Sequence, residues 1–111
     1  HDMSFLWDDF RDRVLDGARL LAAQTVKDAV DQASKDTEAF LLETRDKLER
    51  WTRALVRGDL ERDEFELLVA ARKSNMKMHA LRATGVTQNA IERFRAGLIS
   101  LLIESAFDVI Q

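Results

Sequence analysis

The sequence GLISLLIESAFDVI, residues 97–110, ends a segment of helical periodicity that begins near residue 88. Polar residues recur there at every third or fourth position, which places them on one narrow stripe of an α-helix. The stripe consists of Arg93, Gly97, Ser100, Glu104 and Asp108. Apolar side chains cover roughly two thirds of the circumference, whereas a helix at a protein surface buries a stripe of only ~100°. We therefore predict a helix over 88–110 that needs neighbours on several sides.

Three surroundings would satisfy such a helix: the centre of the chain's own core, an interface between copies of the chain, or a lipid or other apolar surface. Membrane-surface helices carry Lys and Arg beside the apolar face, whereas this polar stripe ends in Glu104 and Asp108. That difference disfavours the lipid surface. If the helix forms an interface, its large side chains should supply most of the affinity. The candidate interface residues are Leu98, Leu102, Phe107 and Ile110.

Two glycine-containing turns divide the rest of the chain. Gly58 can end a helix in the left-handed conformation, and Asp59 can cap the helix that follows. Gly85 and Thr87 repeat this arrangement further along the chain. The expected helices are 4–57, 60–84 and 88–110.

The first expected helix is much longer than the other two. Unbroken, it would span ~80 Å, whereas each of the others reaches about 35 Å at the usual rise per residue. Either this helix breaks, near Gly17 or in the polar segment 32–38, or a second chain covers its extra length. If the helix does not break at Gly17, then Gly17 and Gly97 both lie inside periodic segments. They are then either tolerated there or allow close helix packing. We predict an antiparallel helical bundle of three long helices, the first of them intact or broken into two.

The composition agrees with an all-α fold. The chain of 111 residues is 46% hydrophobic and 33% charged, whereas aromatic residues make up only 7%. Sheets favour the aromatic and β-branched residues that are scarce in this chain. No linker or repeat divides the sequence, so we expect a single helical domain over residues 1–111, in which residues 1–3 resemble the remnant of a purification tag.

Two features indicate a cytoplasmic location. The segment that follows residue 3 contains Asp8, Asp9 and Asp12, which secretory and mitochondrial targeting segments tolerate poorly. The longest mostly apolar segment, 97–110, is interrupted by polar residues and is shorter than the ~20 residues that cross a bilayer. We therefore expect a cytoplasmic protein without a transmembrane helix.

Several classes of chemistry lack the residues that they require. Without cysteine, the chain has no disulfide, no thiolate nucleophile and no cysteine-containing zinc site. A di-iron helical bundle would need a Glu-x-x-His motif, but the residue three before His79 is Met76. Glycine-rich phosphate loops, serine elbows and EF-hand loops are also absent. Carboxylates and His79 are the candidates left for catalysis, so we expect no enzymatic activity and no cofactor.

The second expected helix carries two apolar stripes, which should pack against neighbouring elements. One stripe contains Leu60, Leu67, Ala71, Ser74, Met78 and Leu81, and the other contains Phe65, Val69, Met76, Ala80 and Ala83. The polar face between them can bind an anion or a carboxylate-bearing partner. Its candidate anion-binding residues are Arg72, Asn75, His79 and Arg82. The alternative is that these side chains are solvated or paired with acidic residues of a neighbouring helix.

Charge is distributed unevenly along the sequence. Residues 1–71 hold 11 basic and 17 acidic side chains, a net charge of −6, and residues 72–95 hold 6 basic and 1 acidic, a net charge of +5. We expect the acidic first helix and the basic second helix to neutralise each other, in preference to binding an anionic ligand. A pI near 5.4, against values above ~9 in dedicated nucleic-acid binders, disfavours nucleic acid as a partner.

The sequence supports two main hypotheses about function. The first is a non-enzymatic helical interaction module that self-associates through its apolar C-terminal helix as a dimer or larger assembly, or that binds another helical protein. The alternative is a peripheral binder of a lipid or other apolar surface through amphipathic helices that open on contact. Binding of an anion by the polar face of the second helix is a third hypothesis.

Overall fold

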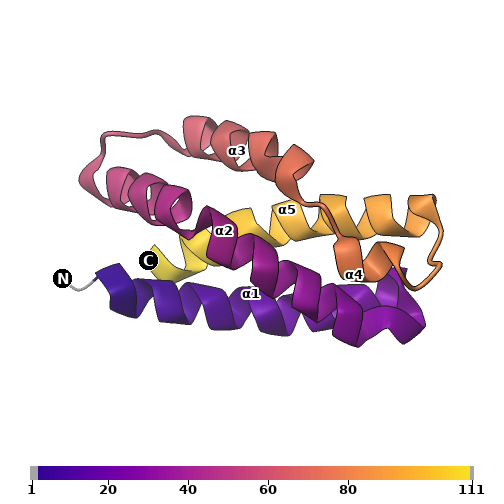
Figure 1. The fold of residues 1–111 in the computed structure, drawn as a ribbon. Coiled ribbons are helices and arrows are strands. Elements are labelled where there is room, and N and C mark those ends of the chain that lie inside the picture. The colour runs from indigo at the N-terminus through magenta and orange to yellow at the C-terminus, as the bar shows by residue number, and fades with distance from the viewer. Residues whose placement is uncertain (1–2, 111) are drawn as a thin grey trace.

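The fold is entirely helical in the part of the chain that the structure describes, which confirms the all-α prediction. The computed structural model describes the backbone of residues 3–110 and the side chains of residues 7–110. The elements are α1 (Met3–Thr25), the short 3-10 helix η1 (Lys27–Ala29), α2 (Val30–Arg57), α3 (Arg62–Ala71), the 3-10 helix η2 (Arg72–Asn75), α4 (His79–Arg82) and α5 (Gln88–Ile110). Successive long helices run in opposite directions, so the fold is an antiparallel helical bundle (Figure 1).

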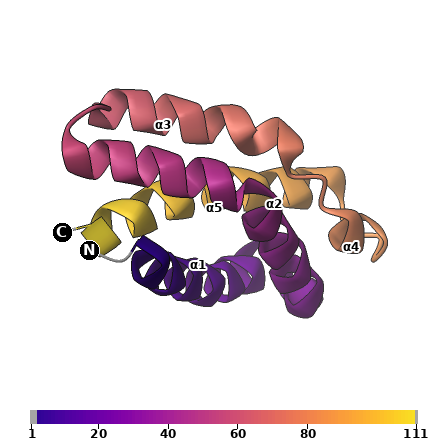
Figure 2. The ribbon, with the colours of Figure 1, turned by 60° about the vertical axis from the view of Figure 1, so that its left-hand side comes forward.

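The helices α1 and α5 lie side by side along their length and run in opposite directions (Figure 1). Each of them contains 23 residues, so they match in length. The helix α2 starts against α1 and continues toward α3, which lies on the outside of the molecule over α2 and α5 (Figure 2). Both ends of the described chain therefore lie at the same end of the bundle (Figure 1).

The first expected helix breaks at η1, and neither predicted position of the break is correct. Gly17 and the segment 32–38 both lie inside helices. The backbone of Lys27 is left-handed, with φ of 45°, and the chain reverses direction there. Val26 and Ala29 are buried on either side of Lys27. Apolar packing at the turn therefore determines where the helix breaks. Neither glycine nor proline marks this position in the sequence.

The expected helix over 60–84 is also interrupted. After α3 and η2 the chain leaves the helical conformation at residues 76–78, and α4 follows as a single turn. Met76 and Met78 are both buried. Residues two positions apart point in nearly opposite directions on a helix but to the same side of an extended chain. The interruption therefore lets both methionines turn toward the same core, whereas a continuous helix would direct them to nearly opposite sides.

The two glycine turns lie where the sequence predicts them. Gly58 and Gly85 have φ of 81° and 85°, which confirms their left-handed conformation. Thr87 caps α5 as predicted, since its Oγ1 accepts a backbone N–H of the first turn at 3.2 Å. The predicted cap after Gly58 is wrong, because α3 begins after Glu61 and not after Asp59. The N–H of Glu61 donates instead to a side-chain oxygen within the first turn of α3, at 2.8 Å.

Gly17 and Gly97 allow α1 and α5 to approach each other closely. A Cβ at Gly17 would lie 2.6 Å from Leu101 Cδ1, and a Cβ at Gly97 would lie 2.7 Å from Leu21 Cδ1. Each glycine therefore accommodates a leucine of the opposite helix. This reciprocal contact confirms close packing, which is one of the two explanations that the sequence leaves open for these glycines.

Candidate functional site

The candidate interface residues of α5 belong to the chain's own core or to its edge. Leu98, Leu102 and Phe107 are buried, and Ile110 is half-buried against the core. Phe107 packs edge-on against Phe65 of α3, with ring centroids 5.5 Å apart. The core thus accounts for the wide apolar circumference of α5. In this structure the three buried side chains present no free surface to a second copy or to lipid.

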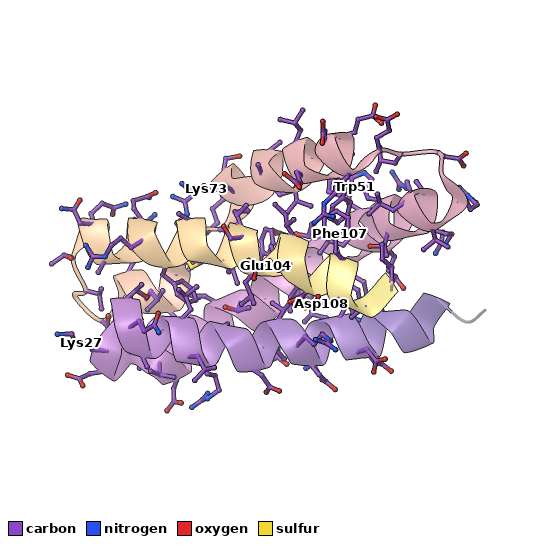
Figure 3. All side chains as sticks on the ribbon, turned by 180° about the vertical axis from the view of Figure 1, so that it is seen from behind. Lys27, Trp51, Lys73, Glu104, Phe107 and Asp108 are labelled. Atoms are coloured by element: carbon purple, nitrogen blue, oxygen red, sulfur yellow. The ribbon has the colours of Figure 1, made fainter. Side chains whose placement is uncertain are left out.

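The polar side chains of the stripe on α5 face solvent, whereas Gly97 of the same stripe packs against Leu21 of α1. Arg93, Ser100, Glu104 and Asp108 are all exposed. Figure 3 shows Glu104 and Asp108 on the side of α5 that borders α1. Arg13 of α1 forms an ion pair with Asp108 there, at 3.6 Å. The outward side of α5 is therefore polar along its length.

The candidate anion-binding residues do not share a helix face. Arg72 and Asn75 lie on η2, whereas His79 and Arg82 lie on α4, beyond the segment 76–78. The shared face requires one continuous helix, so the interruption of the helix makes that prediction wrong. His79 and Arg82 are exposed, and they remain close in the chain on the single turn of α4.

A chain of polar contacts joins η2, α4 and α5. Glu92 on α5 forms ion pairs with Lys73 Nζ at 3.7 Å and with Arg95 Nη1 at 2.5 Å. The amide of Gln88 donates to Glu92 Oε2 at 3.2 Å, and its Oε1 accepts from Arg82 Nη1 at 3.0 Å. The hydrogen bond from Arg95 is the main cause that lowers the pKa of Glu92 below its ordinary value of 4.5. These contacts hold the chain segment that connects α3 to α5 against the first turns of α5.

The basic segment 72–95 is not neutralised by ion pairs with the acidic first part of the chain, contrary to expectation. Within the described side chains, the ion pairs of this segment all end on its own Glu92. Arginines of α1 pair instead with Glu38 and Asp31 of α2. The basic side chains of the segment without an ion-pair partner among the described residues are Arg72, Lys77, Arg82 and Arg93. The segment therefore keeps an excess of positive charge.

The helix α3 carries apolar side chains on two opposite sides. Phe65 and Val69 are fully buried beneath it. Leu67 points the other way and is 71% exposed. Figures 1 and 2 show α3 on the outside of the bundle, with none of the other described elements over this side. The exposed side defines the outer face of α3, which consists of Asp63, Glu64, Leu67, Ala70 and Ala71.

The outer face of α3 is the surface that sequence reasoning missed. Leu67 and Ala71 belong to a stripe that was expected to pack against a neighbour, and the structure leaves both exposed. Met78 of the same stripe is buried, but it lies beyond α3 in the non-helical segment 76–78. The available signal was Asp63 and Glu64, since residues three and four before Leu67 lie on its side of a helix. Two acidic side chains there indicate a face in contact with water.

Charges of opposite sign lie at the two ends of the outer face. Asp63 and Glu64 occupy the first turn of α3, and Arg72 and Lys73 follow its last residue. This order also stabilises α3 itself through the helix dipole. The Nε of Arg72 is buried without a hydrogen-bond acceptor, and neither Arg72 nor Asp63 forms an ion pair with a described side chain. These two charges are therefore unused within the single chain.

The other exposed large apolar side chains among the described residues lie on α1 and α2, and they are Leu20, Leu42 and Val56. Leu42 is 69% exposed, which nearly equals the exposure of Leu67. Its neighbours one turn away are Glu38 and Asp46, both exposed. Arg45, three residues after Leu42, is paired with Glu49 at 3.1 Å. Leu42 thus matches Leu67 in apolar exposure on a different helix, and it provides a control for the outer face of α3.

Comparison with protein-family models, with curated proteins and with solved structures finds no match for this chain. None of the helices within residues 3–110 is long and apolar enough to cross a membrane. Over the same described range, no three side chains of His, Cys, Asp or Glu gather as a metal site would require. A functional assignment therefore has to come from the geometry of the chain itself.

Proposed function

We propose that this chain is a non-enzymatic helical interaction module that self-associates through the outer face of α3. The observation that carries the proposal is Leu67, which is 71% exposed on a helix whose opposite side is fully buried. Burial of a leucine side chain contributes about 1.5–3 kcal/mol, and a symmetric contact buries two of them. Ala70 and Ala71 beside Leu67 leave room for another helix to approach closely.

The proposal places the contact on α3 and not on α5. Leu98 and Leu102 already stabilise the core, so a partner could reach them only if the bundle opened. Leu67 can contact a partner without any rearrangement of the bundle. Most complexes form with little movement of the backbone. The proposal therefore retains the self-association suggested by the sequence, but assigns it to α3 in place of α5.

A second copy suits the outer face of α3 because the two ends of this surface differ in charge. Asp63 and Glu64 lie at one end, and Arg72 and Lys73 follow at the other. A surface that carries both signs at separate places is complementary to itself in one orientation, whereas a surface of one sign repels its copy.

The proposal includes the absence of enzymatic activity and a cytoplasmic location. His79, the histidine considered for catalysis, is exposed on α4. A sequence without cysteine is compatible with the reducing cytoplasm, where disulfides are rare.

Light scattering on a sizing column, over a wide range of concentrations, measures self-association as absolute mass. The mass of the wild-type chain should rise with concentration from 12.7 kDa toward twice that value. Leu67→Glu should keep the chain monomeric, because it places a charge at the apolar centre of the contact. The matched control Leu42→Glu alters an equally exposed leucine and should leave the mass unchanged.

Two results would contradict the proposal. One is a wild-type monomer at every concentration, and the other is a dimer as stable in Leu67→Glu as in the wild type. Both substitutions are at exposed positions, so circular dichroism should show the same helical content in all three chains. Sedimentation of the wild type with lipid vesicles, lost when Phe107 and Ile110 are replaced by Ser, would support the alternative function at an apolar surface instead.

A second candidate function is recognition of an acidic partner by the basic residues around α4. It is favoured by the exposure of Lys77, His79 and Arg82, and by the lack of ion pairs between Lys77 or Arg82 and a described carboxylate. Polyglutamate should then bind, with an affinity that falls steeply as salt concentration rises. The double substitution Lys77→Ala and Arg82→Ala should abolish binding, and binding that is insensitive to salt would exclude this function.

A further inference from the structure

The outer face of α3 constrains how a second copy can lie against it. Most homodimers have two-fold symmetry, in which the same patch of both copies meets. Two helices that meet face to face under this symmetry are either parallel or antiparallel. In the parallel arrangement each residue meets its own copy. In the antiparallel arrangement, a residue that precedes the axis in the sequence of one copy lies level with a residue that follows the axis by the same number of positions in the other copy.

With the axis at Leu67, the antiparallel arrangement places acidic side chains beside small ones. Asp63 and Glu64 lie four and three residues before Leu67, and Ala71 and Ala70 lie four and three residues after it. At the helical rise these positions are about 6 and 4.5 Å from the axis on either side. The alanines of one copy therefore leave space for the acidic side chains of the other.

Lys73, which follows α3 and is 40% exposed, then comes within reach of Asp63 of the second copy. By the helical period, Lys73 lies on the same flank of the helix as Asp63, whereas Arg72 lies toward the buried side with Phe65 and Val69. In an antiparallel contact with two-fold symmetry, the same flank of both helices lies on the same side of the interface. Asp63 therefore faces Lys73 of the second copy.

The single chain leaves these charges available. Asp63 is exposed and has no ion-pair partner among the described residues. Lys73 contacts Glu92 at 3.7 Å, and both side chains are 40% exposed, so a second carboxylate can approach the ammonium group. The parallel arrangement would instead bring the acidic residues of the two copies together, and like charges at this separation repel.

We infer that the chain forms an antiparallel dimer in which the two Leu67 side chains meet at a two-fold axis. Two symmetric ion pairs flank the axis, each from Asp63 of one copy to Lys73 of the other. This inference rests on the proposed self-association and adds the orientation, register and specificity-determining charges of the contact.

A chain without cysteine allows this geometry to be tested by disulfide crosslinking at single introduced cysteines. A disulfide requires Cα atoms about 4.4–6.8 Å apart, so only residues in direct contact across the axis form one readily. Leu67→Cys should crosslink to itself under mild oxidation. Asp63→Cys and Ala70→Cys should each remain uncrosslinked alone and should crosslink to each other in an equimolar mixture. Leu42→Cys measures crosslinking by random collision and should react at least about tenfold more slowly than Leu67→Cys.

The outcomes separate the inference from the proposed function. If Asp63→Cys crosslinks to itself as fast as Leu67→Cys does, the contact is parallel and the inference is wrong, although self-association stands. If light scattering shows a dimer but none of the α3 variants crosslinks faster than Leu42→Cys, the dimer forms through another surface and the inference is again overturned. A monomer at every concentration overturns both the proposed function and the inference.

Discussion

The carboxylate of Asp36 on α2 accepts the backbone N–H of Leu81 on α4 at 2.8 Å, across 45 positions of the sequence. Its other oxygen accepts the N–H of Ala80 at 3.0 Å. The helix α4 is a single turn of four residues, and the N–H groups at the start of a helix have no acceptor within it. Because so short a helix is unstable in water by itself, a side chain of α2 supplies the contact that fixes it.

Removal of this carboxylate should destabilise the chain. Asp36 is only 8% exposed, so Asp36→Ala would leave N–H donors of α4 without an acceptor, at a cost of about 1–3 kcal/mol. Asp36→Asn keeps one acceptor oxygen and should cost less. Urea denaturation followed by circular dichroism gives the free energy of unfolding of each chain.

The control for this prediction is Asp31→Ala on the same helix. The carboxylate of Asp31 is exposed and pairs with Arg19 at 3.2 Å, and an exposed ion pair contributes at most about 1 kcal/mol. Equal losses in Asp36→Ala and Asp31→Ala would contradict the role of Asp36 at α4.

The features that the sequence predicts correctly depend on local signals. Gly58 and Gly85 are the residues best able to adopt positive φ without strain, and Thr87 can cap a helix from its own position. The bounds of α5, residues 88–110, follow from these signals and from an uninterrupted helical period. Each signal and its consequence lie within one or two helical turns, so no knowledge of distant residues is needed.

The features that the sequence does not reveal depend on contacts between distant segments. The interruption at residues 76–78 is stabilised by Asp36, which is 44 positions from Ala80. Helical periodicity in 60–84 contains no information about a carboxylate on α2. The exposure of Leu67, by contrast, has a local signal in the sequence, because Asp63 and Glu64 lie on its side of the helix.

Substitution of Gly97 by a larger residue should weaken the packing of α1 against α5. A Cβ at Gly97 would lie 2.7 Å from Leu21 Cδ1, so Gly97→Val forces the leucine side chain or the helices apart. Overpacking of this kind costs about 1–3 kcal/mol. Urea denaturation should show the loss as a lower midpoint.

The matched control introduces the same side chain one position earlier. Ala96 is exposed on α5, so Ala96→Val changes only helix propensity, by less than ~0.7 kcal/mol. If Gly97→Val is no less stable than Ala96→Val, the reciprocal contact does not limit the approach of the two helices.

The ion pairs of Glu92 should make stability depend on pH. The pKa of Glu92 is lowered from 4.5 in the folded chain, chiefly by the hydrogen bond from Arg95. A carboxylate with a lowered pKa contributes stability above its unfolded pKa and loses that contribution as pH falls through its folded pKa. The wild type should therefore have a higher Tm than Glu92→Gln at pH 7, and the difference should shrink below pH 4.5.

An exposed carboxylate of the same helix serves as the reference for this pH dependence. Glu104 lies on the outward stripe of α5 and forms no ion pair with a described side chain. Glu104→Gln should have nearly the same Tm as the wild type at neutral pH. A difference between wild type and Glu92→Gln that stays constant from pH 7 to pH 3 would show that the charge of Glu92 does not stabilise the fold.

Charge reversal should test which residues meet in the dimer. Asp63→Lys places a positive charge opposite Lys73 of the second copy, and Lys73→Glu places a negative charge opposite Asp63 of the second copy. Exposed pairs contribute up to about 1 kcal/mol each, and each substitution replaces two attractions by two repulsions. Each single variant should therefore raise the Kd of the dimer at least about tenfold, as measured by light scattering across concentrations.

The chain that carries both Asp63→Lys and Lys73→Glu recovers opposite charges at both symmetric positions. Its Kd should return to within about threefold of the wild-type value, since the pairs are restored in the reverse sense. In 1 M salt the differences among all four chains should shrink, because exposed charges are then screened over about 3 Å. If the doubly substituted chain dissociates as readily as the single variants, Asp63 and Lys73 do not face each other across the axis.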